Sequence, residues 1–162
     1  MSCVVEPLTA QYDENVRQII EQVGAEFGAV GEGYGPSDPE VLCMSQHYGN
    51  ESKSLYLVAL LDGKVVGGCG LASFNSSPDV CELKKLFILP EGRGYGLGKR
   101  MAIACLDYAR TQGYQSCYLD TLTSMKVAVR LYENLGFDHL DAPLADTLHN
   151  SCDVWMLKSL VE

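Results

Sequence analysis

The stretch CELKKLFILPEGRGYGLGK, residues 81–99, decides what the rest of the chain can be. It predicts a strand over 82–89, a Pro-Glu-Gly turn, a run of alternating glycines and then a helix. Because the glycines carry no side chain, the backbone amides of residues 94–99 can approach an anion closely at the positive end of that helix. The stretch therefore predicts a phosphate or pyrophosphate site, although a glycine-rich turn that binds nothing has the same pattern.

Two familiar phosphate-binding motifs fail on spacing. A P-loop requires Gly, and later Ser or Thr, at the positions where this chain has Arg93 and Arg100. A dinucleotide fingerprint, G-x-G-x-x-G, lacks its last glycine whether it begins at Gly92 or at Gly94. What remains is an arginine followed by glycines three and five residues later, directly after a strand.

That remaining pattern, Arg93-x-x-Gly96-x-Gly98, resembles the acyl-CoA pyrophosphate loop of the GCN5-related N-acetyltransferases, the GNAT superfamily. A second block, AVRLYENLGF at 128–137, resembles the A-x-x-L-Y-x-x-x-G-F signature of motif B in that family. The ending TLHNSCDVWMLKSL is similar to a bacterial group of uncharacterised members. Met125 stands where many members carry Asn, which leaves a usual polar contact to the pantetheine arm open.

Hydrophobic periodicity along the chain predicts one domain, 1–162, with the element order β-α-α-β-β-β-α-β-α-β-β. This is the GNAT order, and the resemblance implies an α+β fold with a central, mostly antiparallel twisted sheet and helices on both faces. The expected strands are 4–8, 54–61, 64–74, 80–89, 117–122, 137–140 and 154–160, and the expected helices are 10–27, 41–48, 101–112 and 124–135.

Three local signals refine this order. Asp62-Gly63 is a strong hairpin signal between two strands. Asp38 is expected to cap the second helix, with Pro39 at its first position. The helix after the glycine loop is expected to bury a face that includes Ile103, Leu106 and Ala109.

The composition indicates a folded chain, with 47% hydrophobic residues and a mean hydropathy of +0.01. No apolar run approaches the roughly 20 residues that span a bilayer, and the first residues do not resemble a secretory signal. Seven scattered cysteines without a C-x-x-C pair are typical of reduced core residues, not of disulfides or zinc. We therefore expect a cytoplasmic protein with no metal and no membrane contact.

Charge is distributed unevenly, and the net charge of −9 argues against a nucleic-acid partner. Residues 1–52 hold nine acidic side chains and one basic one, whereas residues 84–100 hold five basic side chains and one acidic one. This asymmetry suits a cationic acceptor and an anionic cofactor, and it equally suits ordinary solvated surfaces.

Acetyl transfer to an amine requires that the ammonium loses a proton before the nitrogen attacks. Glu82 is the candidate base, since the resemblance places it where some GNAT enzymes use a glutamate, and strand alternation predicts that it shares a face with Leu86 and Ile88. Alternatively, Glu82 pairs with Lys84 or orders solvent. Tyr132, in motif B, is the candidate acid for the leaving sulfur, or else a core tyrosine.

The resemblance also implies how acyl-CoA binds and where the acceptor enters. Backbone groups of the strand end would bind the pantetheine arm and polarise the thioester carbonyl. The loops 27–36 and 142–152 would wall the acceptor pocket, with Asp38 nearby as a further acidic side chain. The cofactor residues are Leu86, Phe87, Ile88, Arg93, Gly94, Tyr95, Gly96, Leu97, Gly98, Lys99 and Arg100, and the acceptor-pocket candidates are Glu32, Tyr34, His149 and Cys152.

The sequence as a whole predicts an acetyl-CoA-dependent N-acetyltransferase that acts on a small amine or amino acid by direct attack in a ternary complex. His149 is a rival base, because an imidazole works at neutral pH without a pKa shift. The alternatives are a peptide or protein acceptor and a non-catalytic acyl-CoA-binding module. A homodimer is compatible with the sequence.

Overall fold

The structure is a computed structural model that describes residues 2–145, 147, 149 and 151–161. Its centre is a seven-stranded sheet in the order β1-β2-β3-β4-β5-β7-β6. Only β4 and β5 run parallel, joined by the crossover helix α2, and the other five pairings are antiparallel. The strands are β1 Cys3–Pro7, β2 Leu55–Leu61, β3 Lys64–Ser73, β4 Val80–Ile88, β5 Ser116–Thr121, β6 Asp138–His139 and β7 Val154–Ser159.

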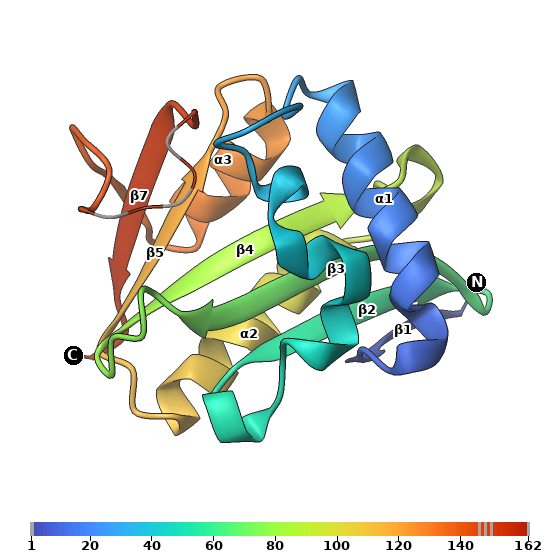
Figure 1. The fold of residues 1–162 in the computed structure, drawn as a ribbon, viewed down its shortest axis with the longest axis horizontal. Coiled ribbons are helices and arrows are strands. Elements are labelled where there is room, and N and C mark those ends of the chain that lie inside the picture. The colour runs from blue at the N-terminus through green and yellow to red at the C-terminus, as the bar shows by residue number, and fades with distance from the viewer. Residues whose placement is uncertain (1, 146, 148, 150, 162) are drawn as a thin grey trace.

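Helices cover both faces of this sheet (Figure 1). Helix α1, Asp13–Glu26, buries an apolar stripe against β2, β3 and β4 on one face. Helix α2, Leu97–Thr111, and helix α3, Lys126–Asn134, pack on the other face over the larger core cluster. The predicted α+β architecture is therefore confirmed. Five short 3₁₀ segments complete the fold: Ala10–Tyr12, Gly35–Ser37, Pro39–Gln46, Asn50–Ser52 and Pro90–Gly92.

Two helix predictions were wrong in detail. The second helix is a 3₁₀ segment that begins at Pro39 and is kinked at Cys43, and Asp38 makes no capping hydrogen bond because its carboxylate pairs with other side chains. Ile103 is 39% exposed, whereas Leu106 and Ala109 are buried. The helix turns every 3.6 residues, so a three-residue repeat drifts off the buried face.

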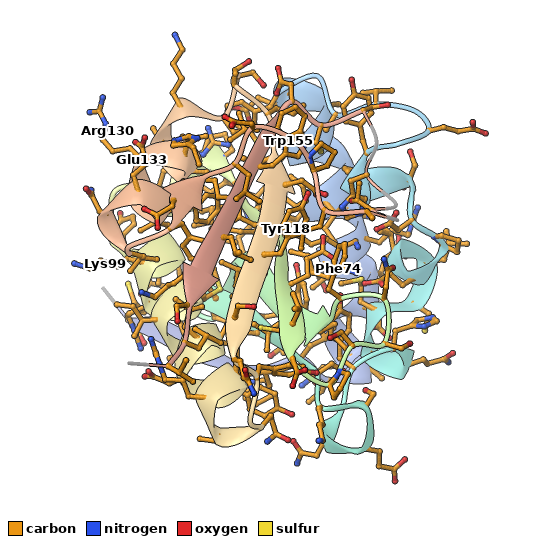
Figure 2. The ribbon with its side chains drawn as sticks, turned by 90° about the vertical axis from the view of Figure 1, so that its left-hand side faces the viewer. Phe74, Lys99, Tyr118, Arg130, Glu133 and Trp155 are labelled. Carbon is orange, nitrogen blue, oxygen red and sulfur yellow. The ribbon has the colours of Figure 1, made fainter. Side chains whose placement is uncertain are left out.

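The hairpin prediction agrees with the structure. Asp62 and Gly63 both have positive φ, 50° and 84°, as a two-residue turn of the primed type requires. Phe74, directly after β3, contacts Tyr118 of β5 with ring centroids 5.0 Å apart and ring planes tilted by 59° (Figure 2).

A β-bulge in β4 reverses the expected alternation of side chains. Gly68 pairs with Phe87 but Gly70 pairs with Lys84, so β4 contains one extra residue between these pairs. Lys85, at the bulge, has a positive φ of 56°. Lys84 and Lys85 consequently both reach the α1 face, where each pairs with Glu40.

The bulge also separates Glu82 from the residues with which it was expected to share a face. Leu83 and Leu86 both join the core under α2, with Ile88 packed against it. Glu82 instead points to the opposite face, toward His149. The prediction that Glu82 lies beside Leu86 and Ile88 was therefore wrong, because the extra residue shifts the period-two pattern by one.

Strands β4 and β5 diverge after a short paired segment (Figure 1). Their register runs from Val80↔Ser116 to Glu82↔Tyr118, although β4 continues to Ile88 and β5 to Thr121. Within the part of the chain that the structure describes, no strand pairs with the β5-facing edge of β4 beyond Glu82. Backbone groups on this edge are available to bind a ligand.

Candidate active site

A cleft of about 560 Å³ lies beside the glycine loop. We call it the glycine-loop cleft. The end of β4, the glycine loop with the start of α2, and α3 form its walls. The predicted residues that line it are Leu86, Phe87, Ile88, Arg93, Gly94, Gly96, Leu97, Gly98 and Lys99, and it is also lined by Met125, Lys126, Val127, Ala128 and Leu131.

The glycine loop presents the amino end of α2 to this cleft. Gly94 and Gly96 have φ of 88° and 74°, values that L-residues with a side chain rarely adopt. The first intrahelical bond that reaches back to the N-cap runs from the Arg100 amide to the Gly96 carbonyl, 3.1 Å. The amides of residues 97–99 therefore have no partner within the helix, and together with the helix dipole they suit an anion.

Three predicted cofactor residues lie differently from the expectation. The Arg93 guanidinium donates two 2.8 Å bonds to the Glu26 carboxylate at the end of α1, and it lies 5.5 Å from the Phe27 ring. Tyr95 is exposed, and the Arg100 guanidinium donates to the Cys3 carbonyl at 3.3 Å, away from the cleft. Neither Tyr95 nor Arg100 lines the glycine-loop cleft, so their side chains are not expected to hold a ligand there.

A second cavity, narrower at about 60 Å³, adjoins the first. We call it the Glu82 cavity. It brings together five predicted residues from distant parts of the chain: Glu82, Tyr132, Tyr34, His149 and Cys152. Glu32 does not line it, since its side chain is exposed and only its carbonyl is engaged, by the Ser151 hydroxyl at 3.1 Å.

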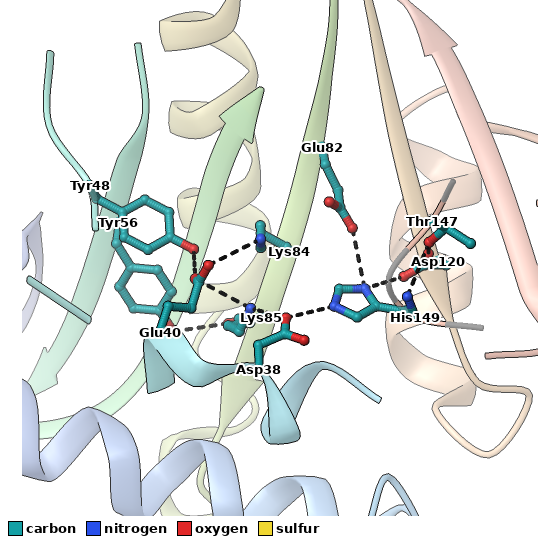
Figure 3. A network of polar contacts seen from close by, with 10 residues as sticks. All are labelled: Asp38, Glu40, Tyr48, Tyr56, Glu82, Lys84, Lys85, Asp120, Thr147 and His149. Carbon is teal, nitrogen blue, oxygen red and sulfur yellow. Dashed lines mark hydrogen bonds and ion pairs between the residues drawn. The ribbon is translucent and has the colours of Figure 1, made fainter. Parts of the chain in front are cut away.

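His149 is the centre of a buried polar network (Figure 3). Its Nδ1 lies 2.8 Å from Asp120 Oδ1 on β5, and its Nε2 lies 2.7 Å from Asp38 Oδ2. Glu82 Oε2 lies 3.4 Å from the same Nδ1. The other Asp120 oxygen accepts a 2.6 Å hydrogen bond from the Thr147 hydroxyl.

The carboxylates around His149 determine its protonation. Burial alone would lower the pKa of His149, but hydrogen bonds to Asp120, Asp38 and Glu82 raise it to about 11. Burial would likewise raise the pKa of Asp38, yet His149 and Lys85 lower it to about 2. His149 is therefore an imidazolium at neutral pH. A ring that carries both protons cannot accept another, which argues against His149 as the rival base.

The bulge lysines extend the network toward α1. The Lys85 ammonium lies 2.7 Å from Asp38 and 3.3 Å from Glu40, and the Lys84 ammonium lies 3.4 Å from Glu40. Tyr48 donates a hydrogen bond to Glu40. Burial lowers the pKa of Lys85. For Lys84, burial also acts to lower the pKa, but the nearby carboxylates outweigh it and the pKa is raised. Glu82 thus has His149, not Lys84, as its ion-pair partner.

Sequence reasoning missed Asp120, Glu40 and Lys85. Two adjacent lysines inside an otherwise apolar strand are a signal of a bulge or of buried counter-ions, and this signal was available in 81–89. Asp120, near the end of an apolar strand, carried no comparable signal. Its carboxylate joins the site because Thr147 and His149, which lie between β6 and β7 in the sequence, are within hydrogen-bond distance of it.

The three side chains Glu82, Asp120 and His149 offer ligand atoms within 4.8 Å of one another. A metal ion on Nδ1 would have to replace the proton that this nitrogen donates to Asp120. We interpret the cluster as an ion-pair network.

The two remaining candidates are held in their neutral forms by burial. Tyr132 packs edge-on against Phe137 with centroids 5.9 Å apart, and burial raises the pKa of its hydroxyl well above the ordinary value. Burial also raises the pKa of the Cys152 thiol, with support from the charge of Asp120. Tyr132 therefore keeps its proton at neutral pH and can donate a hydrogen bond, and Cys152 is poorly suited to act as a nucleophile.

The fold and the two adjoining cavities define an acyltransferase of one particular class. Residues 18–137 match the model of the "Acetyltransferase (GNAT) family". The chain belongs to this family, and it is an enzyme of the N-acetyltransferase class.

Individual relatives agree with this assignment. The chain is 40% identical to the uncharacterised N-acetyltransferase YjgM of Escherichia coli K12, over 98% of this chain and 96% of that protein. It is 37% identical to the N-acetylaspartate synthetase of Xenopus tropicalis over 60% of this chain and 35% of that protein. The yncA structure of Salmonella typhimurium, solved with its cofactor acetyl-CoA, superposes with a TM-score of 0.79 at 17% identity and covers 100% of this chain and 96% of its own.

Among the described residues, no helix has both the length and the apolar character that a membrane crossing requires.

Proposed function

We propose that the protein transfers the acetyl group of acetyl-CoA to a primary amine of a small metabolite or amino acid, by direct attack in a ternary complex. The observation that carries this proposal is the junction of the two cavities. Leu86, Phe87 and Met125 line both of them. An acyl chain that ends at this junction would meet an acceptor that enters through the Glu82 cavity.

The charges around the Glu82 cavity support a cationic acceptor. Four carboxylates, those of Asp38, Glu40, Glu82 and Asp120, surround three cations, Lys84, Lys85 and His149. The described residues of the network therefore carry one excess negative charge, which a single ammonium would balance. The ion-pair contact of Glu82, 3.4 Å, is longer than the shortest ion-pair contact of Asp38, Asp120 or Glu40, and Glu82 is 7% exposed.

The glycine-loop cleft supports acetyl-CoA as the cosubstrate. It offers the amides of 97–99 for the pyrophosphate. Its apolar side chains, which include Leu86, Ala128 and Leu131, would contact the pantetheine arm. Acetyl-CoA supplies an activated thioester. Met125 lines the cleft with a thioether in place of an amide, so the arm would be held there by packing and by backbone groups of β4.

Each chemical demand then has a candidate group. Glu82 takes a proton from the acceptor ammonium, directly or through water, and the free amine attacks the thioester carbonyl. Unpaired backbone amides on the β5-facing edge of β4 stabilise the developing oxyanion. As the carbon–sulfur bond breaks, the Tyr132 hydroxyl donates its proton to the sulfur. The attacking nitrogen loses its extra proton as the amide forms, and this proton, carried by solvent, restores the Tyr132 hydroxyl. Cys152 keeps its proton, which favours direct transfer over an acetyl-cysteine intermediate.

We also propose that residues 1–162 act as one domain, since the two cavities are built from segments between Val23 and Cys152. A peptide or protein acceptor and a non-catalytic acyl-CoA-binding module are the alternatives.

A panel of acceptors tests the proposal. Acetyl-CoA is mixed with amino acids (aspartate among them, because of the synthetase relative), polyamines and lysine peptides, and thiol release is measured. Turnover with a small amine supports the proposal, turnover with peptides alone redirects it, and binding of acetyl-CoA without any turnover favours the non-catalytic module.

Glu82→Gln tests the base once an acceptor is known. The variant keeps the shape but loses the basicity, so kcat/KM at pH 7 should fall about 100-fold. The deficit should shrink as pH approaches the acceptor's own pKa, because free amine becomes abundant. The control is Glu133→Gln, an exposed glutamate that pairs with His139. A deficit that stays constant up to alkaline pH would mean that Glu82 positions the amine instead.

A further inference from the structure

His149 connects three separate walls of the Glu82 cavity (Figure 3). Asp38 comes from the segment between α1 and β2, Asp120 comes from β5, and Glu82 comes from β4, and all three carboxylates reach the one ring. The two shortest contacts, 2.7 and 2.8 Å, span 111 and 29 residues of sequence. The side chains are almost inaccessible, with 7% exposure for His149, 13% for Asp38 and 1% for Asp120.

This geometry requires a ring that carries two protons. A neutral imidazole has one N–H, so one of its nitrogens would direct a lone pair at a carboxylate oxygen. Both nitrogens of His149 lie within hydrogen-bond distance of carboxylates. An imidazolium donates to both at once, and these charge-assisted bonds are about twice as strong as neutral ones.

We propose that His149, as a permanent imidazolium, is a positioning residue that holds the walls of the acceptor cavity together and leaves Glu82 free for the acceptor ammonium. This inference rests on the proposed function of the Glu82 cavity. The ring contacts Asp38 and Asp120 at short range and Glu82 only at 3.4 Å, and Lys84 is the other cation on which the charge of Glu82 acts. The arrangement specifies an acceptor with one ammonium group.

Other charged groups face the same network from the neighbouring elements. Lys85 on β4 neutralises Asp38 from the side opposite the ring. Thr147 donates to the second oxygen of Asp120. Cys152, which lines the cavity, stays a thiol because burial raises its pKa. The imidazolium is therefore the only cation in the described network that touches both Asp38 and Asp120.

The protonation state can be measured without any acceptor. In protein labelled with ¹⁵N at histidine, His149 should show two protonated ring nitrogens at pH 8, whereas free histidine, with a pKa near 6.5, is then largely neutral. Assignment uses His149→Gln, which removes one set of signals. A His149 ring with one unprotonated nitrogen at pH 8 would overturn the inference.

The positioning role is tested by steady-state kinetics. In His149→Gln both N–H donors come from one nitrogen and the amide is neutral, so its carbonyl oxygen would face one of the two carboxylates. KM for the acceptor should rise about tenfold or more, because small displacements of a bound substrate are costly. Acetyl-CoA affinity by calorimetry should change less than about twofold, since the ring does not line the glycine-loop cleft. His139→Gln, at an exposed histidine, is the control. An unchanged acceptor KM would overturn the role.

A double variant guards against simple misfolding. In His149→Gln with Asp38→Asn, two neutral amides can hydrogen-bond to each other and restore the link between the walls. The acceptor KM of this double variant should be lower than the product of the two single effects predicts, and a fully multiplicative loss would contradict the linkage.

The two failures are distinguishable. An imidazolium at pH 8 in a protein that acetylates no amine would sink the proposed function alone. Turnover of a small amine by a protein with neutral His149 would sink this inference alone.

Discussion

Tyr132 is a residue whose role packing alone does not decide. It is buried on α3 against Phe137, as an ordinary core tyrosine would be, yet it also lines the Glu82 cavity. Burial keeps the hydroxyl protonated up to strongly alkaline pH because it raises the pKa. A protonated hydroxyl in the Glu82 cavity can donate a hydrogen bond, which is what a leaving thiolate needs.

Tyr132→Phe should therefore lower kcat by about 10- to 100-fold and leave acetyl-CoA affinity nearly unchanged. The loss should stay below that of a typical general acid, because a thiol with a pKa near 8.5 is already a fair leaving group. Tyr114→Phe, at a buried tyrosine that lines neither cavity, is the matched control. Wild-type turnover of Tyr132→Phe under rate-limiting chemistry would return Tyr132 to a packing role.

At the scale of elements, the start of α2 is the part of the chain that the glycines shape for an anion. Gly96 is its N-cap and has a φ of 74°. Asn tolerates this region better than most residues, and Asp differs from Asn by little more than its charge. Comparing the two substitutions separates electrostatic effects from backbone strain.

Gly96→Asp should weaken CoA binding about tenfold more than Gly96→Asn does, because the added carboxylate would repel the pyrophosphate. The amino end of a helix stabilises a bound anion by up to ~2 kcal/mol, and the carboxylate would oppose this effect. Calorimetry on folded variants measures both affinities. Equal affinities in the two variants would show that the pyrophosphate does not lie on these amides.

The contact between α1 and the segment before η3, the 3₁₀ segment Pro39–Gln46, sets one wall of the Glu82 cavity. A Cβ on Gly24 of α1 would lie 2.6 Å from Pro36 Cγ, and Pro36 is part of that wall. The proline ring is rigid, so the segment must move if Gly24 gains a side chain.

Gly24→Ala should raise the acceptor KM more than it affects acetyl-CoA affinity. The alanine gains about 1 kcal/mol of helix propensity, and overpacking costs ~1–3 kcal/mol, so the net change in stability should be small or unfavourable. Gly49→Ala is the control, since a Cβ there meets nothing within 4 Å. Unchanged kinetics for Gly24→Ala would mean that this wall does not contact the acceptor.

For the whole molecule, three of the nine acidic residues in 1–52 pair with three of the five basic residues in 84–100. Glu26 pairs with Arg93, Asp38 with Lys85, and Glu40 with both Lys84 and Lys85. The acidic first third and the basic segment therefore hold α1 and its following loop against β4. The uneven distribution of charge along the sequence is therefore explained in part by ion pairs within the fold, and not by ligand binding alone.

The pH dependence of stability should reflect this pairing. His149 has a folded pKa of about 11, above its unfolded value near 6.5, so its contribution is complete below about pH 6.5 and is lost as pH rises toward 11. Asp38 has a folded pKa of about 2, so its contribution is present above about pH 4 and is lost as pH falls toward 2. The free energy of unfolding should be greatest near pH 4–6.5.

Urea titrations between pH 6 and 10 measure the alkaline arm of this dependence. The slope of unfolding free energy against pH should be smaller in His149→Gln than in the wild type, and His139→Gln should leave it unchanged. Equal slopes in all three proteins would contradict the assignment of the alkaline loss to His149.

Local patterns in the sequence determined most of the elements and the conformation of the glycine loop. The Asp62-Gly63 turn, the apolar stripe of α1 and the glycine spacing after β4 are set by neighbours within a few residues, so they could be predicted. The resemblance to the GNAT family, through motif B and the strand before the glycine loop, was sufficient to nominate Tyr132 as the candidate acid and Glu82 as the candidate base.

Only the tertiary structure decided how the charged side chains pair and which way β4 faces. An extra residue at Lys85 reverses the alternation; the adjacent lysines hint at an irregular strand, but only the pairing with β3 shows where the extra residue lies. The protonation of His149 depends on carboxylates 29, 67 and 111 residues away in the sequence. These carboxylates contact the ring only because the fold brings β4, β5 and the segment between α1 and β2 to the same cavity. Electrostatic interactions act through space, and sequence order does not encode the distances on which they depend.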